Sequence, residues 1–114
     1  MASVVDPACV GAEEKSAHDL VVLDLRELVN SFDVLVICSA RNDRQVRSIV
    51  EEVERVVARD VGVHPLRVEG LAEGQWVAMD YGDVIIHVFD EETRSYYDLE
   101  HLWNAAAVLR PQTT

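Results

Sequence analysis

The stretch that decides the fold is residues 75–90, QWVAMDYGDVIIHVFD. Two apolar runs within it flank the pair Tyr81 and Gly82. Glycine adopts a positive φ without steric cost, and a glycine between two apolar runs is typical of the turn of a β-hairpin. The stretch therefore predicts two antiparallel strands, with the carboxylates of Asp80 and Asp83 at the tip that joins them.

A long amphipathic helix is predicted upstream of this hairpin. Asn42 can cap its first turn while the side chain of Gln45 reaches back, as in a capping box, and Gly62 supplies the left-handed residue that ends it. The apolar residues between these caps recur at steps of three and four, which places them on one stripe of a helix. They are Val46, Ile49, Val50, Val53, Val56, Val57 and Val61.

Three further stretches have the composition of β-strands. Residues 20–25, LVVLDL, and residues 34–40, VLVICSA, are rich in leucine and β-branched residues, which is typical of buried strands. Residues 66–70, LRVEG, alternate in polarity after Pro65, so we expect a short strand near the edge of the sheet.

Helices are also predicted at both ends of the chain. Pro7 follows an acidic residue and suits the first helical position, so we expect a ragged helix from there to about His18. Residues 92–110 return to helical spacing, and residues 111–114 are expected to form a loose tail. The apolar stripe of this last helix is Tyr96, Leu99, Trp103 and Ala106.

Together these elements predict one α/β domain over residues 1–114, with its core at about residues 8–104. A chain of 114 residues is large enough for one core and too small for two. A strand, a crossover helix and another strand give a parallel pair, while the hairpin adds antiparallel strands. We therefore expect a mixed central β-sheet of about five strands flanked by helices.

The chain is strongly acidic, with 21 acidic residues against 10 basic ones and a formal net charge of −11. Such a charge repels phosphate backbones and anionic lipids, which disfavours direct binding of DNA and of membranes. It favours a basic partner, and strongly basic proteins are commonly those that bind nucleic acid. The alternative is that the charge only keeps the protein soluble.

With no signal segment or membrane span, and with Cys38 interpreted as a small core residue, we expect a reduced, cytoplasmic protein.

The hairpin can be interpreted as a catalytic site or as a docking surface. Asp24, Asp80 and Asp83 are candidates to hold a divalent cation for nucleotide chemistry, but no glycine-rich phosphate-binding motif is present. We interpret His87 as a hydrogen-bonded histidine of the sheet rather than a catalytic base. Trp76 either packs on the sheet or remains partly accessible beside a polar, glycine-flanked loop, where it would serve docking.

Several blocks of the sequence follow one another in a distinctive order: HDLVVLDL, VLVICSARNDRQVRSIVEEVE, VEG, WVAMDYGDVIIHVF and YYDLEHLW. In this order they resemble the ribosomal silencing factor family, also called the Iojap family, over about residues 15–104. The resemblance implies a nucleotidyltransferase-like fold without catalytic residues, and no cofactor or metal. It implies binding to the large ribosomal subunit through ribosomal protein L fourteen, which blocks joining of the small subunit and represses translation in nutrient shortage.

The resemblance, together with the aromatic and acidic character of the hairpin, predicts a surface that binds a ribosomal protein. Gly70 and Gly82 are expected at structural turns, and the apolar edge of the hairpin suggests a homodimer off the ribosome. The chain departs from the family pattern at Phe32, Val34 and Ala40. The predicted partner-binding residues are Glu69, Trp76, Met79, Asp80, Tyr81, Asp83 and Glu100.

Overall fold

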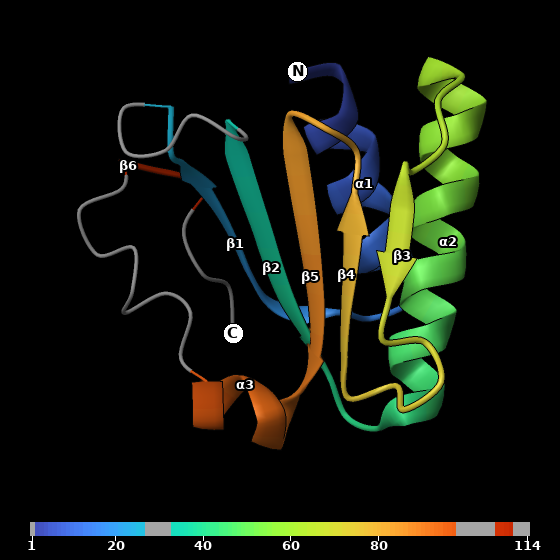
Figure 1. Cartoon of the computed structure of the whole chain (residues 1–114), viewed down its shortest axis with the longest axis vertical. Helices are drawn as coiled ribbons and strands as arrows, with labels where there is room; N and C mark the ends of the chain where they lie inside the picture. The colour runs from blue at the N-terminus through green and yellow to red at the C-terminus, as the bar shows by residue number, and fades with distance from the viewer. Residues whose placement is uncertain (1, 27–32, 98–106, 111–114) are drawn as a thin grey trace.

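The computed structural model describes residues 2–26, 33–97 and 107–110. In these residues the chain forms three helices and one six-stranded mixed sheet with the order β3-β4-β5-β2-β1-β6 (Figure 1). The expected α/β fold is confirmed. The helices are α1 (Ala2–Glu14), α2 (Asp43–Val61) and α3 (Glu91–Tyr97), and the strands are β1 (His18–Asp24), β2 (Val34–Ala40), β3 (Arg67–Glu69), β4 (Trp76–Asp80), β5 (Val84–Asp90) and β6 (Ala107–Arg110).

The predicted hairpin is confirmed as β4 and β5, which pair antiparallel with Asp80 opposite Ile85. The backbone N–H of Tyr81 donates to the carbonyl oxygen of Val84 at 2.9 Å, and Gly82 has a φ of 90°. The hairpin does not form an edge of the sheet, because β3 pairs with β4 and β2 pairs parallel with β5. The open apolar edge that suggested a homodimer is therefore absent from β4 and β5.

The caps predicted for α2 are also confirmed. Asn42 Oδ1 accepts a hydrogen bond from the backbone N–H of Gln45 at 2.8 Å, and Gln45 Oε1 accepts one from the N–H of Arg41 at 2.7 Å. Gly62 adopts a φ of 78° and donates its N–H to Ala58. Every residue of the predicted apolar stripe except Val61 is buried.

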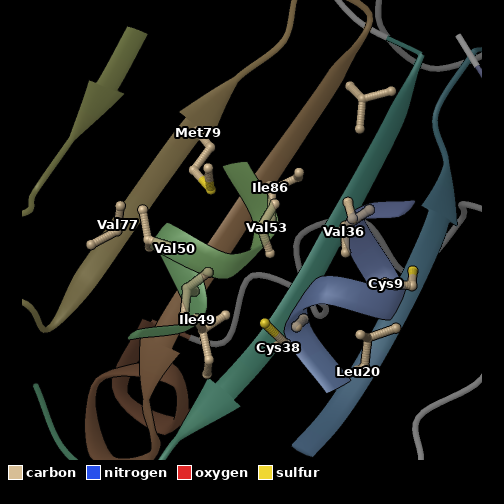
Figure 2. Packing of buried hydrophobic residues seen from close by; sticks show 14 of the residues in the cluster. Cys9, Leu20, Val36, Cys38, Ile49, Val50, Val53, Val77, Met79 and Ile86 are labelled. Carbon is tan, nitrogen blue, oxygen red and sulfur yellow. The ribbon is translucent and has the colours of Figure 1, made fainter. Parts of the chain in front are cut away.

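The main core lies between the sheet and the layer formed by α1 and α2, which cover one face of the sheet (Figure 1). Figure 2 shows side chains from both helices and from the sheet gathered in this layer. Cys38 is completely buried there, as expected, and burial raises the pKa of its thiol to about 12. A second cluster occupies the opposite face and consists of Val21, Leu23, Leu25, Leu35, Ile37 and Phe89. Because β2 is buried on both faces, its sequence is apolar except for Ser39.

The two ends of the chain differ from expectation. Helix α1 begins at Ala2, so Pro7 lies inside it rather than at its first position, and the helix ends at Glu14. Pro7 is buried, and tertiary packing outweighs the backbone hydrogen bond that proline cannot make. Near the other end, Ala107–Arg110 form a strand instead of the end of a helix.

The strand at Ala107–Arg110 follows from the open edge of β1. It pairs antiparallel with β1, with Val108 opposite Leu23, and so satisfies backbone groups that helix formation would leave unpaired.

The expected stripe of the last helix is wrong at Tyr96, which is 81% exposed. The other stripe residues, Leu99, Trp103 and Ala106, lie outside the described residues. Among the described helices, none has the length and apolar character needed to cross a bilayer.

The packing of α1 on α2 generates a prediction at Gly11. A Cβ atom at this position would lie 2.9 Å from the carbonyl oxygen of Glu52 and from the Cα of Val53. We expect Gly11→Val to lower the free energy of unfolding by about 1–3 kcal/mol, because the helices must separate to admit the side chain. Urea unfolding followed by circular dichroism measures this loss.

The control is Asp6→Val, which adds the same side chain at an exposed position of α1. It should change the free energy of unfolding by no more than about 0.5 kcal/mol. Equal unfolding midpoints for the two variants would show that close approach of the helices is not needed.

Candidate docking surface

Three of the predicted partner-binding residues lie on the sheet face opposite α1 and α2. Side chains alternate along a strand, so Trp76 and Asp80 share one face of β4 while Val77 and Met79 point to the helices. Glu69 pairs with Ala78, which puts it on the same face as Trp76. We call the partly or fully exposed residues of this region the outer strip: Arg67, Glu69, Trp76, Ala78, Asp80, Ile85 and His87.

Trp76 is held in the outer strip by contacts across the β4–β5 pairing. Its indole Nε1 donates a hydrogen bond to His87 Nδ1 at 2.7 Å. The indole stacks on the ring of Phe89, with the centroids 4.9 Å apart, and the ring of Tyr97 lies 4.7 Å from it. Trp76 is therefore packed on the sheet and also partly accessible, so both interpretations of this residue apply.

His87 is a hydrogen-bonded histidine of the sheet, as interpreted from the sequence. Burial lowers its pKa from 6.5 to about 4, so the imidazole is neutral at pH 7. Because Nδ1 accepts the bond from Trp76, the proton of the neutral ring is on Nε2. The group that contacts Nδ1 is an indole N–H rather than the carboxylate that a catalytic base would need to orient it.

The acidic residues differ in how firmly they are held. Asp80 Oδ1 accepts a hydrogen bond from the backbone N–H of Gly82 at 2.8 Å, which supports the turn. Asp83 has an exposed side chain, and its carbonyl oxygen accepts hydrogen bonds from the N–H groups of Asp33 and Val34. Glu69 is exposed on the edge strand β3. These acids give the outer strip and the nearby turn a negative rim.

Two predicted anchors do not belong to this surface. Met79 is completely buried in the core beneath the helices, so its side chain is not available to a partner. Tyr81 packs against the same core, and its hydroxyl oxygen is buried without a hydrogen-bond partner among the described residues. Burial, and then the charge of Glu54, raise the pKa of Tyr81 to about 12. Trp76 and Tyr81 therefore lie on opposite faces of the sheet, because Trp76 packs against the second cluster and Tyr81 against the main core. Glu100 lies outside the described residues.

The two glycines expected at turns have conformations that require glycine. Gly70 has a φ of 95°, and a Cβ atom there would lie 2.1 Å from the carbonyl oxygen of Trp76. Gly82 has a φ of 90° in the hairpin turn. Both positions would be strained with any other residue.

Sequence reasoning missed residues that support or extend the outer strip. Arg47 on α2 donates hydrogen bonds to the carbonyl oxygens of Leu71 and Ala72, at 3.0 and 2.8 Å, and so holds the loop that leads into Trp76. Tyr97, at the end of α3, is 49% exposed beside Trp76. No local pattern signals the Arg47 contacts, because their partners are 24 and 25 residues away.

Comparison with known proteins identifies the chain. Residues 2–114 match the family model described as ribosomal silencing factor during starvation. This chain belongs to the ribosomal silencing factor family. The resemblance found in the sequence blocks is thus confirmed.

Individual members of the ribosomal silencing factor family and solved structures agree with this assignment. The ribosomal silencing factor RsfS of Bacillus subtilis is 36% identical over 104 residues, which are 91% of this chain and 87% of that protein. The chloroplastic protein Iojap of Zea mays is 30% identical over 90% of this chain and 45% of its own length. A crystal structure of a protein from Chromobacterium violaceum matches with a TM-score of 0.86 at 29% identity, covering 100% of this chain and 92% of that one.

The alternative function, a metal-dependent nucleotide enzyme, requires a cluster of metal ligands. The described residues contain no such cluster. Within residues 2–26, 33–97 and 107–110, no three acidic, histidine or cysteine side chains are grouped so that they could hold a metal ion. Asp24 instead pairs with Arg26, whose hydrogen bonds lower the pKa of that carboxyl. Asp24 on β1 is separated from Asp80 on β4 by β2 and β5 in the sheet order.

The buried His87 predicts a pH dependence of stability. Its pKa is lowered in the folded state, so the unfolded state binds more protons between about pH 6.5 and about pH 4. The stabilisation is complete above about pH 6.5 and is lost as the pH falls toward 4. We expect wild-type protein to lose roughly 2 kcal/mol more than His87→Gln between about pH 7 and about pH 4.5.

Urea unfolding at the two pH values measures this difference, and carboxylates contribute equally to both proteins. His64→Gln, a change at an exposed histidine, should keep the pH dependence of the wild type. Parallel stability curves for wild type and His87→Gln would contradict a buried, neutral His87.

Proposed function

We propose that this protein silences ribosomes by docking on the large subunit through ribosomal protein L fourteen, so that the small subunit cannot join. Family membership supports a role in ribosome silencing. The observation that carries the docking proposal is the outer strip itself. Trp76 is a rigid, partly accessible aromatic group fixed by His87 and Phe89. Anchors of this kind contribute most of the binding energy at protein interfaces.

The charge of the protein supports a ribosomal protein as the contact rather than ribosomal RNA. Ribosomal proteins are generally basic because they neutralise RNA, whereas this chain has a net charge of −11. Glu69 and Asp80 in the outer strip, with Asp83 at the hairpin turn, supply acidic groups that pair with lysine or arginine. An acidic surface docks on a basic protein without any RNA contact of its own.

The mechanism that follows is steric. The folded chain measures 35 × 34 × 24 Å along its principal axes. A body of this size, bound where the two subunits meet, occupies space that the small subunit needs. No bond is made or broken, so the action requires neither a cofactor nor a catalytic residue. We propose that the factor acts in the cytoplasm and represses translation when nutrients are scarce.

Truncation of the aromatic anchor tests the docking proposal. We expect Trp76→Ala to weaken binding to purified large subunits by about 1–3 kcal/mol, or roughly 5- to 150-fold in Kd, because the central apolar contact is lost. Co-sedimentation with large subunits measures the affinity, and circular dichroism verifies that the variant is folded. Inhibition of subunit joining should fall in parallel.

Leu66→Ala is the matched control, because Leu66 is 77% exposed and precedes β3 on the helix side. This variant should bind as the wild type does. Undiminished binding of folded Trp76→Ala would refute the outer strip as the docking site.

The electrostatic contribution is tested by reversing one charge at two locations. Glu69→Lys lies in the outer strip, whereas Glu51→Lys lies on the exposed side of α2. Both variants change the net charge equally, so any difference between them reflects location. We expect Glu69→Lys to lower the association rate constant for large subunits by about threefold or more relative to Glu51→Lys at low salt.

The difference between these two variants should shrink as salt is raised, because salt screens exposed charges. Stopped-flow association at several salt concentrations measures both quantities. Identical rates for Glu69→Lys and Glu51→Lys would remove the electrostatic part of the docking proposal.

A further inference from the structure

Helix α3 presents two tyrosines to solvent. Tyr96 is 81% exposed and Tyr97 is 49% exposed, whereas tyrosine in folded proteins is on average intermediate in burial. Tyrosine is also enriched in protein interfaces, because it supplies rigid contact area and a polar end. Arg94 attaches α3 to the fold, and the exposed tyrosines are not needed for that attachment. A binding partner that covers them explains their exposure.

The exposed tyrosines are continuous with Trp76. The ring of Tyr96 meets that of Tyr97 edge-on, with an interplanar angle of 86° and centroids 5.0 Å apart. Tyr97 in turn packs on Trp76, which stacks on the buried ring of Phe89. We call these four residues the aromatic ladder: Phe89, Trp76, Tyr97 and Tyr96. The ladder runs from the core of the protein to its surface.

The helix that carries the outer end of the ladder is firmly attached. Asp90 Oδ1 accepts a hydrogen bond from the backbone N–H of Thr93 at 2.8 Å and so caps the first turn of α3. The guanidinium of Arg94 is buried and donates to the carbonyl oxygen of Asp19 and to Ser39 Oγ. Because α3 is held in place at both points, a ligand that binds the tyrosines spends little free energy on ordering the helix.

The charges of α3 select the kind of ligand. Arg94, the one basic residue of this helix, is withdrawn into the protein, whereas Glu91 and Glu92 are exposed. Tyrosine faces combined with carboxylates attract a cation. A guanidinium suits this combination better than an ammonium, because it is planar, stacks on aromatic rings and pairs with a carboxylate through parallel N–H groups.

We propose that the outer end of the aromatic ladder binds an arginine side chain of the basic partner. The guanidinium stacks on the exposed ring of Tyr96, next to the ring of Tyr97 that lies edge-on to it, and pairs with the carboxylate of Glu92. The identity of the partner rests on the proposed function, whereas the preference for arginine rests on the structure of α3 alone. The docking surface then extends from the outer strip across α3.

Tyr96 provides the sharpest test, because it contacts Tyr97 and is otherwise exposed, so its replacement leaves Trp76 in place. Tyr96→Leu removes the aromatic face but keeps an apolar side chain, and Tyr96→Phe keeps the ring. We expect Tyr96→Phe to bind large subunits within about twofold of the wild type and Tyr96→Leu to bind about three- to tenfold more weakly. Equal binding by Tyr96→Leu and wild type, where the wild type binds, overturns the inference.

A second arm separates this inference from the proposed function. Ten-residue peptides of arginine only and of lysine only carry equal charge, and isothermal titration calorimetry at low salt compares their affinities for the wild type and for Tyr96→Leu. We expect the wild type to prefer the arginine peptide by about threefold or more and Tyr96→Leu to lose that preference. If the wild type does not bind large subunits, the proposed function fails and the peptides alone decide the inference. A wild type without preference for the arginine peptide overturns it.

Discussion

The register between β4 and β5 is the constraint on which the candidate surface depends. Trp76 lies opposite Phe89, and Ala78 lies opposite His87, so the indole reaches both aromatic neighbours from one position. A slip of one residue would turn Trp76 toward α1 and α2 and expose Met79 instead. Burial of Val77 and Met79 on the helix side of β4, together with the tight turn at Gly82, prevents such a slip. Docking and stability therefore derive from the same pairing.

The two faces of the sheet have separate roles. The face under α1 and α2 contains the larger core, which includes Cys38 and Met79. On the opposite face, the side chains of β1 and β2 are apolar and buried. Residues of β3, β4 and β5 on this face remain partly accessible. The proposed steric action needs a stable body and one recognition surface, and this division of the sheet provides both.

The sequence predicted those features that depend on neighbouring residues. The caps of α2 at Asn42 and Gly62 and the turn at Gly82 were found because each signal lies within a few positions of the structure it determines. Trp76 and Tyr81 are close in the sequence but pack on opposite faces of the sheet, so their shared surface is not found in the structure. The strand at Ala107–Arg110 and the contacts of Arg47 were missed because each depends on a partner far along the chain.

The hydrogen bond between Trp76 and His87 has a consequence for recognition. An indole has a single N–H donor, and in this protein that donor is already occupied by an imidazole nitrogen inside the same molecule. Any molecule that binds Trp76 therefore contacts the ring of the indole and finds no free hydrogen-bond donor on it. Shape and dispersion forces must govern that contact, and complementary hydrogen-bonding groups on the opposing protein would bring no advantage there.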